Sequence, residues 1–313
     1  MKRMIGRRLL QSIPLLLVVS SLTFVLVSLI PGSIATALIG LQGTPAEYAQ
    51  LEHQLGLDKP VYVQYWNWLE KAFHGNLGAS LQNNQSVVAI LASRIDVTII
   101  LIAATVIVVA VVGMGLGIVA ARRGGLLGRI LDALVWIGVG VPNFWLGLLF
   151  VSVFAVSLHA LPAEGLVSFA TSPSGWAKSL VLPIIALAAG PVAVVMKQTR
   201  DEMVVVLRSE YIRTLRASGV PERSIVFKHA LKNAALPVTT VLGVLFINLL
   251  SGTVVVETVF ALPGLGSLAA SAVAAHDLPV VEGVAVYFTL IVIAINLLVD
   301  IAYGWLSPKV RVR

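Results

Sequence analysis

The chain has 313 residues, of which 58% are hydrophobic and only 12% are charged. Soluble domains are about one quarter charged, and several apolar runs of about 20 residues indicate a bilayer rather than a large soluble core. The chain has no cysteine, which excludes disulfides and thiolate metal sites. The net charge of +7 on its own would suit nucleic acid or anionic lipid as a partner.

Six apolar segments predict an all-α integral membrane protein with six transmembrane helices, since helices satisfy their own backbone groups within lipid. The segments are Leu9–Ile30, Thr98–Ala120, Ile130–Leu158, Ser179–Met196, Ala235–Val256 and Val280–Tyr303. The first segment follows a basic N-terminus, as in a signal peptide. However, it exceeds the usual apolar length of about 7–15 residues and lacks a clear cleavage site. We therefore predict a retained first span.

Lysine and arginine are distributed unevenly between the loops that these spans would create. Eighteen of the 22 lie in the N-terminal segment, in the loop after the second span, in residues 197–232 and in the C-terminal tail. The remaining four are Lys59, Lys71, Arg94 and Lys178. Because cytoplasmic loops carry the excess of basic residues, both termini are predicted to be cytoplasmic. The positive charge then needs no nucleic acid to explain it.

A long external loop, residues 31–97, follows the first predicted span. Loops of this length usually have structure of their own. Within it, Thr44–Leu55 predicts a short helix, with Thr44 as the N-cap and Glu47 at the third helical position. The aromatic stretch Val61–Phe73 either lies on the membrane surface or packs against helix ends.

Residues 197–236 are far longer than a minimal connector between two spans. They predict a helix over Arg200–Ala217, a turn, and a second helix over Pro221–Asn233. Gly219 is placed to end the first helix in a left-handed conformation, and Glu222 suits the positive end of the second. A solvated basic loop is the alternative interpretation, but a rigid projecting helix is what the groove of a partner can hold.

This segment also carries a motif. The run Tyr211-Ile212-Arg213-Thr214-Leu215-Arg216-Ala217-Ser218-Gly219-Val220, followed by His229–Ala234, resembles the cytoplasmic coupling loop of type I ABC importer permeases. It is most similar to the branch that imports dipeptides, oligopeptides and, in some members, nickel. Arg213-Thr214-Leu215 replaces the wider family's Glu-Ala-Ala, and Leu231-Lys232 replaces its Leu-Pro; both departures are typical of the peptide branch. Further similar segments follow the family's order: Pro31-Gly32, Leu55–Pro60, Gln64-Tyr65, Gly75–Gly78, Val256–Phe260, Pro263–Gly266, Asn296–Asp300 and Leu306–Arg311.

The resemblance implies the permease subunit of an ABC importer in a bacterial or archaeal cytoplasmic membrane. It implies a first helix and external loop over residues 1–94, a type I transmembrane domain over 95–304 with a coupling loop at 200–233, and a cytoplasmic tail over 305–313. The implied partners are a second homologous permease, two ATP-binding subunits, an external substrate-binding protein and the lipid bilayer. ATP and magnesium would bind to partner subunits, so no cofactor and no catalytic residue are expected in this chain.

The expected ATPase contacts lie around the predicted turn. They are Arg213, Arg216, Gly219, Pro221, Glu222 and Arg223. The cargo stays open, because peptides, nickel complexes and other small solutes are handled by similar permeases. Asn143, Glu257 and Phe260 are candidates for the cargo path, since a polar or charged group lies there beside a helix break near the outer half of the bilayer.

Other acidic residues and helix breaks have two interpretations each. Asp132 and Asp300 are either functional charges within the membrane or interfacial and paired ones. Pro142-Asn143 and Gly190-Pro191 interrupt the third and fourth predicted spans, as a cavity lining or as simple kinks. The segment 262–266 breaks any helix in the external loop 258–279.

Several other classes of protein are disfavoured. Gly113, Gly115 and Gly117 lie inside an apolar span, so close helix packing explains them better than a nucleotide loop. The five histidines show no metal-ligand spacing, and no zinc-protease motif is present. A stand-alone secondary transporter would show an inverted repeat and a central acid, and neither is evident. A phosphate-binding loop needs Gly-Lys, and no lysine follows a glycine.

Overall fold

The structure is a computed structural model that describes residues 2–29, 39, 43–123, 128, 130, 133, 135, 138 and 140–306. Within these residues the chain is mostly helical and contains no β-strand, only an isolated antiparallel bridge between Ala79 and Ser86. The Pro31-Gly32 motif, Asp132 and the tail from Ser307 onward lie outside the described residues.

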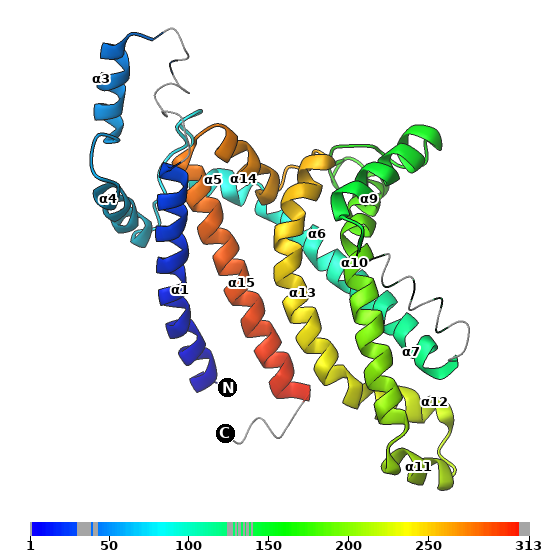
Figure 1. The fold of residues 1–313 in the computed structure, drawn as a ribbon. Coiled ribbons are helices and arrows are strands. Elements are labelled where there is room, and N and C mark those ends of the chain that lie inside the picture. The colour runs from blue at the N-terminus through cyan, green and yellow to red at the C-terminus, as the bar shows by residue number, and fades with distance from the viewer. Residues whose placement is uncertain are drawn as a thin grey trace. The chain divides into compact units, whose positions relative to one another are not determined.

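The described helices follow one another along the chain (Figure 1). They are α1 (Lys2–Ser28), α3 (Pro45–Leu55), α4 (Val61–Phe73), α5 (Val87–Ala92), α6 (Ile95–Val108), α7 (Met114–Arg123), α9 (Asn143–Phe150), α10 (Pro173–Leu207), α11 (Glu210–Ala217), α12 (Glu222–Ser224), α13 (Leu231–Val259), α14 (Leu265–Ala274) and α15 (Leu278–Leu306). Among the described residues, two π-helical segments join neighbouring helices, η1 (Val109–Gly113) and η3 (Ile225–Ala230). A third, η2 (Val151–Ser157), continues α9.

Five helical stretches of the described chain are long and apolar enough to cross a membrane. They are Gly6–Ser28, Val87–Arg123, Pro173–Leu207, Glu222–Val259 and Leu278–Ile301. Each matches one of the predicted spans. The remaining predicted span, Ile130–Leu158, is described only in part, and Asn143–Ser157 within it is a shorter apolar helix. The count of six spans therefore stays a prediction.

The chain divides into two compact units. The N-terminal unit comprises Lys2–Thr98 and Pro263–Ala294, and the central unit comprises Ile99–Leu262 and the residues from Ile295 onward. The predicted domain boundaries are a separate proposal based on the family resemblance, and they stay a prediction.

In the N-terminal unit, α3 begins with the predicted cap. The backbone N–H of Thr44 donates to Glu47 Oε2 at 2.7 Å, and the backbone N–H of Glu47 donates to Thr44 Oγ1 at 3.3 Å. This reciprocal capping box satisfies donors that a helix end leaves unpaired. The bond from the Thr44 backbone, with help from its hydroxyl, holds the pKa of the Glu47 carboxyl below its ordinary value. The predicted short helix is confirmed.

Helix α4 packs against α1 in the same unit. The hydroxyl of Tyr65 lies 2.9 Å from Ser20 Oγ, and its ring meets Phe24 edge-on at 5.6 Å between centroids. Packing on a helix, one of the two interpretations of Val61–Phe73, is thus observed, and placement at the membrane surface stays a prediction. The segment 262–266 was predicted to break any helix in this loop, but its last two residues, Leu265 and Gly266, begin a helix that was not predicted, α14, with Gly264 as its N-cap. The Thr98 hydroxyl accepts a 2.8 Å hydrogen bond from the backbone N–H of Leu265, one of the free donors at this helix start.

In the central unit, η1 and α7 pack closely on α10 through one glycine each. A Cβ placed on Gly113 would lie 2.9 Å from Val195 Cβ, and one on Gly117 would lie 2.6 Å from Thr199 Cβ. Gly115, between them, has no atom within 4 Å of such a Cβ. The prediction of close packing through Gly-x-x-x-Gly is confirmed, and the four-residue spacing explains why the middle glycine faces away.

Helix α10 corrects one prediction. It runs without interruption through Pro183 and Pro191, so Gly190-Pro191 does not interrupt the fourth span as a cavity lining, and the alternative of a simple kink stays open. Each proline removes one backbone hydrogen bond, but neighbouring helices hold the long helix together. Contacts with α7 and α13 flank α10 along its length. By contrast, Pro142 does mark a break, because α9 begins directly after it.

Candidate coupling corner and cargo path

The residues from Leu207 to Glu222 form a sharp corner, here called the coupling corner, between α10 and α12 (Figure 1). Helix α10 ends at Leu207, and Ser209 adopts an extended backbone with φ −70° and ψ 153°. The Ser209 hydroxyl donates a 2.6 Å hydrogen bond to the carbonyl oxygen of Val206. The prediction of one helix over Arg200–Ala217 is therefore wrong, because this serine satisfies a helix-end carbonyl and allows the chain to turn.

The turn after α11 has the predicted left-handed glycine. Gly219 has φ +76°, and its backbone N–H donates to the carbonyl of Arg216 at 3.0 Å. The backbone N–H of Val220 donates to the carbonyl of Leu215 at 3.1 Å. These two bonds are the Schellman pattern, which closes a helix end and fixes the direction in which the chain leaves it.

The second arm of the corner differs in part from the prediction. Pro221 precedes the helix as its N-cap and accepts a 2.8 Å hydrogen bond from the backbone N–H of Ser224. The predicted helix Pro221–Asn233 does not end at Asn233. Instead, α12, η3 and α13 form one helical stretch over Glu222–Val259. Its π-helical segment conceals this continuity from a pattern search, because the residues shift from the 3.6-residue period.

Arg216 connects the two arms. Its guanidinium donates to both carboxylate oxygens of Glu222, from Nε at 3.2 Å and from Nη2 at 3.0 Å. The same guanidinium donates from Nη1 to the carbonyl oxygen of Leu207 at 3.4 Å. One side chain thus bridges the end of α10 and the start of α12. The pair is 44% exposed on each side, so it orients the corner more than it stabilises the fold.

The corner is also held by packing. Ile212 is fully buried on α11, and the Tyr211 hydroxyl accepts a 2.7 Å hydrogen bond from the side-chain amide of Asn233 at the start of α13. Beneath the corner, a buried apolar cluster joins side chains of α7, α10, η3 and α13: Ile118, Met203, Val226, Ala230 and Ala234. Helix α11 itself contacts η3, which contributes Val226 and Ala230 to this cluster. Movement of α11 would therefore reach the cluster through η3, since close-packed interiors transmit strain.

The remaining corner residues face outward. Gly219, Pro221 and Arg223 are exposed, and Arg213 is exposed while paired with Glu210 at 2.7 Å. Two exposed aromatic side chains lie nearby, Phe227 at 52% and Tyr211 at 41%. Tyr211 begins the motif, but neither side chain was predicted as an ATPase contact. An aromatic residue within a basic segment is a sequence signal that points to such a surface.

The three cargo-path candidates lie in the central unit. Asn143 begins α9, and a Cβ on Gly252 of α13 would lie 3.6 Å from its amide nitrogen. Phe260 is buried and packs on Gly147, where a Cβ would lie 3.1 Å from the ring. Glu257 is fully buried in α13. The structure thus places Asn143 and Phe260 at contacts between α9 and α13. Their exposure to cargo stays a prediction. For Glu257 and Phe260, which are buried, exposure requires the helices around them to move.

Of the acidic residues within the predicted apolar segments, the most deeply buried one that the structure describes was not among the two named from the sequence. Asp132 is outside the described residues, and Asp300 is half-buried in α15. Glu282, in the first turns of α15, was not singled out, yet it is fully buried. Neither of its carboxylate oxygens has a hydrogen-bond partner among the described residues. The sequence does contain a feature that could have identified Glu282, namely an acidic residue inside the predicted apolar segment 280–303. The described residues contain no group of three His, Asp or Glu side chains that could hold a metal ion.

These features define a helical protein with several membrane-spanning segments and a hydrogen-bonded corner between two of its long helices. The family model described as "Binding-protein-dependent transport system inner membrane component" matches residues 113–312. The model of the N-terminal region of such membrane components matches residues 1–102. The chain belongs to this family of transport-system inner membrane components.

Similar proteins agree with this family. A chain of Brucella abortus (strain 2308), named as a peptide transport system permease protein, is 41% identical over 312 residues, with 99% of each chain covered. The dipeptide transport system permease protein DppB of Alkalihalophilus pseudofirmus is 36% identical over 326 residues, covering 97% of this chain and 98% of its own length. Among solved structures, an inward-facing MetNI methionine ABC transporter gives a TM-score of 0.57 at 18% identity. That match covers 70% of this chain and 96% of the MetNI chain, and it establishes similarity of fold alone.

Proposed function

We propose that this chain is the transmembrane permease subunit of an ATP-binding-cassette importer and that it forms half of a translocation pathway for peptides. Its family membership and the peptide permeases among its relatives support this function. The observation that carries the coupling role is the corner itself. Two hydrogen-bonded turns and one bridging arginine connect an exposed short helix to long apolar helices, and its contact with η3 leads to the buried cluster that joins them.

In the proposed mechanism, a groove on a partner ATPase holds α11 and the turn after it. The outward residues Arg213, Gly219, Pro221 and Arg223 would meet the partner, while Arg216 and Glu222 keep the two arms in register. Closure of the ATPase dimer would push α11, and the buried cluster would pass that displacement to α10 and α13. Rotation of these helices would then open or close the path for cargo.

The finer architecture belongs to the same proposal. Six spans would place both termini and the coupling corner in the cytoplasm, with a long external segment after the first span. ATP and magnesium would bind to two partner ATPases, so this chain would contribute no catalytic residue. A second homologous permease would complete the path, and an external binding protein would deliver the cargo. Asn143, Glu257 and Phe260 would line the path in one of its conformations.

Two alternatives are kept. A permease of the same architecture that imports nickel or another small solute would use the same corner, since the corner is proposed to contact the ATPase and not the cargo. A stand-alone secondary transporter would need no ATPase, and the rigid exposed helix α11 would then have no partner to fit.

Purification from the native membrane in mild detergent tests the proposal. We expect two ATPase chains, a second permease and a bound or captured peptide to be identified by mass spectrometry. Purification of this chain alone, as an active ion-driven transporter, would contradict the proposal. A co-purified nickel complex in place of peptide would keep the importer and replace the cargo.

A further inference from the structure

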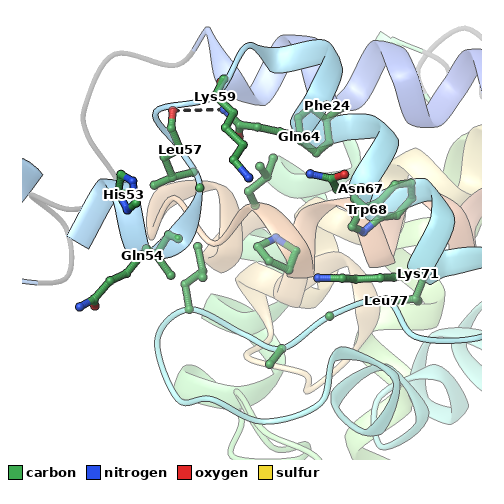
Figure 2. Close-up of a pocket in the computed structure, with 17 residues that line it drawn as sticks. Phe24, His53, Gln54, Leu57, Lys59, Gln64, Asn67, Trp68, Lys71 and Leu77 are labelled. Atoms are coloured by element: carbon green, nitrogen blue, oxygen red, sulfur yellow. Dashed lines mark hydrogen bonds between the residues drawn. The ribbon is translucent and has the colours of Figure 1, made fainter. Parts of the chain in front are cut away.

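The N-terminal unit contains a cavity of about 430 Å³ beside α4 (Figure 2). Its walls are the end of α3 and the segment after it, one face of α4, the chain before α5, Phe24 of α1 and the first residues of α15. Figure 2 shows Lys59 and Lys71 extending into this space, with Asn67 and Trp68 beside them. The Gln64 side chain also lines the cavity, but its amide nitrogen already donates a hydrogen bond to the carbonyl oxygen of Lys59 at 2.7 Å.

The cavity offers hydrogen-bond donors without a negative charge to meet them. No Asp or Glu is among the residues that line it. Neither Lys59 nor Lys71 forms an ion pair within the part of the chain that the structure describes. The indole nitrogen of Trp68 is buried and has no hydrogen-bond partner among the same residues. That nitrogen is closed off from the cavity, so the two ammonium groups define its chemistry. Two ammonium groups beside one space favour an anion with several acceptor oxygens.

The depth of the cavity relative to α1 points to the source of that anion. Phe24 lines the cavity, and the candidate span in α1 ends at Ser28. The rise along the helix from Phe24 to Ser28 is about 6 Å, so the cavity lies close to the end of this span. Leu278 and Pro279, the first residues of another candidate span, line it as well. The ends of spans lie where hydrocarbon gives way to headgroups, in a layer several ångströms thick.

Helix α4 has the character of an interfacial helix. Its Tyr65 is bonded to Ser20, about 12 Å of helix before the end of α1, so α4 lies alongside the span rather than above it. Tyr62, Trp66 and Phe73 are 74%, 67% and 74% exposed. Aromatic side chains of this kind are enriched at the boundary between lipid and water.

We propose that this cavity binds the phosphate group of an anionic phospholipid. Lys59 and Lys71 supply the charge, and the acyl chains lie along the apolar surface of α1 and α4. This inference does not depend on the ATPase or on the cargo of the proposed importer. A basic pocket at the end of membrane helices is a known way for proteins to bind lipid headgroups.

Native mass spectrometry of the full-length chain in neutral detergent tests the site. Phosphatidylglycerol and phosphatidylcholine with identical acyl chains are the two probes, and inorganic phosphate is the competitor. The variants are Lys59→Gln and Lys71→Gln, and Lys178→Gln is the matched control, since Lys178 is an exposed lysine outside the cavity. We expect phosphatidylglycerol to bind more tightly than phosphatidylcholine. Each cavity variant should weaken phosphatidylglycerol by about fivefold and the control should not.

Three results would overturn the proposal. The first is equal binding of the two lipids by the wild-type chain. The second is unchanged phosphatidylglycerol binding by both cavity variants, which would show that the two lysines do not hold the lipid. The third is complete displacement of the lipid by millimolar inorganic phosphate, which would assign the site to a solute. All variants replace exposed lysines, and thermal unfolding of each should match that of the wild-type chain.

Discussion

Substitution of Gly219 examines the coupling corner most sharply. The residue has φ +76°, and an added Cβ would have no atom within 4 Å. Gly219→Ala therefore introduces backbone strain without a clash. The left-handed conformation costs a residue with a Cβ about 1 kcal/mol, which is roughly a fivefold change in the population of the turn. Gly219→Asn should cost less, because asparagine tolerates this region, and Gly219→Val should cost more.

Gly56 provides the matched control. It has φ +68° at the end of α3, and a Cβ there would also meet no atom within 4 Å. Gly56→Ala thus applies the same strain to a turn outside the coupling corner. Both variants should insert normally and should lose little overall stability.

The assay is ATP hydrolysis by the reconstituted transporter, with and without loaded binding protein, together with cargo uptake. We expect stimulation to fall in the order Gly, Asn, Ala, Val at position 219, by about fivefold for alanine. Gly56→Ala should behave as the wild-type chain does. Equal activity of the whole Gly219 series would refute the reasoning and reduce the turn to a connector. An equal loss in Gly56→Ala would show that the assay reports general damage.

Further outcomes follow from the same structure. Ile212→Ala removes the buried side chain of α11 and should destabilise the corner locally by about 2–5 kcal/mol, lowering ATPase coupling more than membrane insertion; limited proteolysis of the corner measures this loosening. Gly117→Ala would bring a Cβ to 2.6 Å from an α10 side chain and should cost about 1–3 kcal/mol by thermal unfolding, whereas Gly115→Ala should be neutral. A cysteine in place of Ser218 should react only with reagents that reach the cytoplasm, and labelling from outside would reverse the topology. Glu257→Gln should change uptake of cationic cargo more than anionic cargo, and unchanged uptake of both would remove Glu257 from the path.

Local chemistry in the sequence predicted several features well. The start of α3 follows from Thr44 and Glu47, because a capping box lies within four consecutive residues. The left-handed Gly219 follows from its place after a helical run. The close approach of η1 and α7 to α10 follows from glycines four residues apart. Each of these signals is complete within one or two helical turns.

Features that depend on distant partners were missed. Pro191 looked like a break, yet packing on two neighbouring helices keeps α10 continuous. The end of α10 depends on one hydroxyl bond from Ser209, and serine is too common to signal a corner. Helix α14 begins with Leu265 bonded to Thr98, a residue 167 positions away in the chain. The bridge from Arg216 to Glu222 and Leu207 likewise requires the fold before it can be seen.

Uptake by proteoliposomes tests the central claim most directly. The full complex is reconstituted with its binding protein, a labelled dipeptide is supplied on one side, and ATP is supplied on the side of the ATPases. The account predicts dipeptide accumulation that requires ATP hydrolysis and that declines in the Gly219→Val variant. Accumulation driven by an ion gradient in vesicles that contain this chain without any ATPase would contradict it.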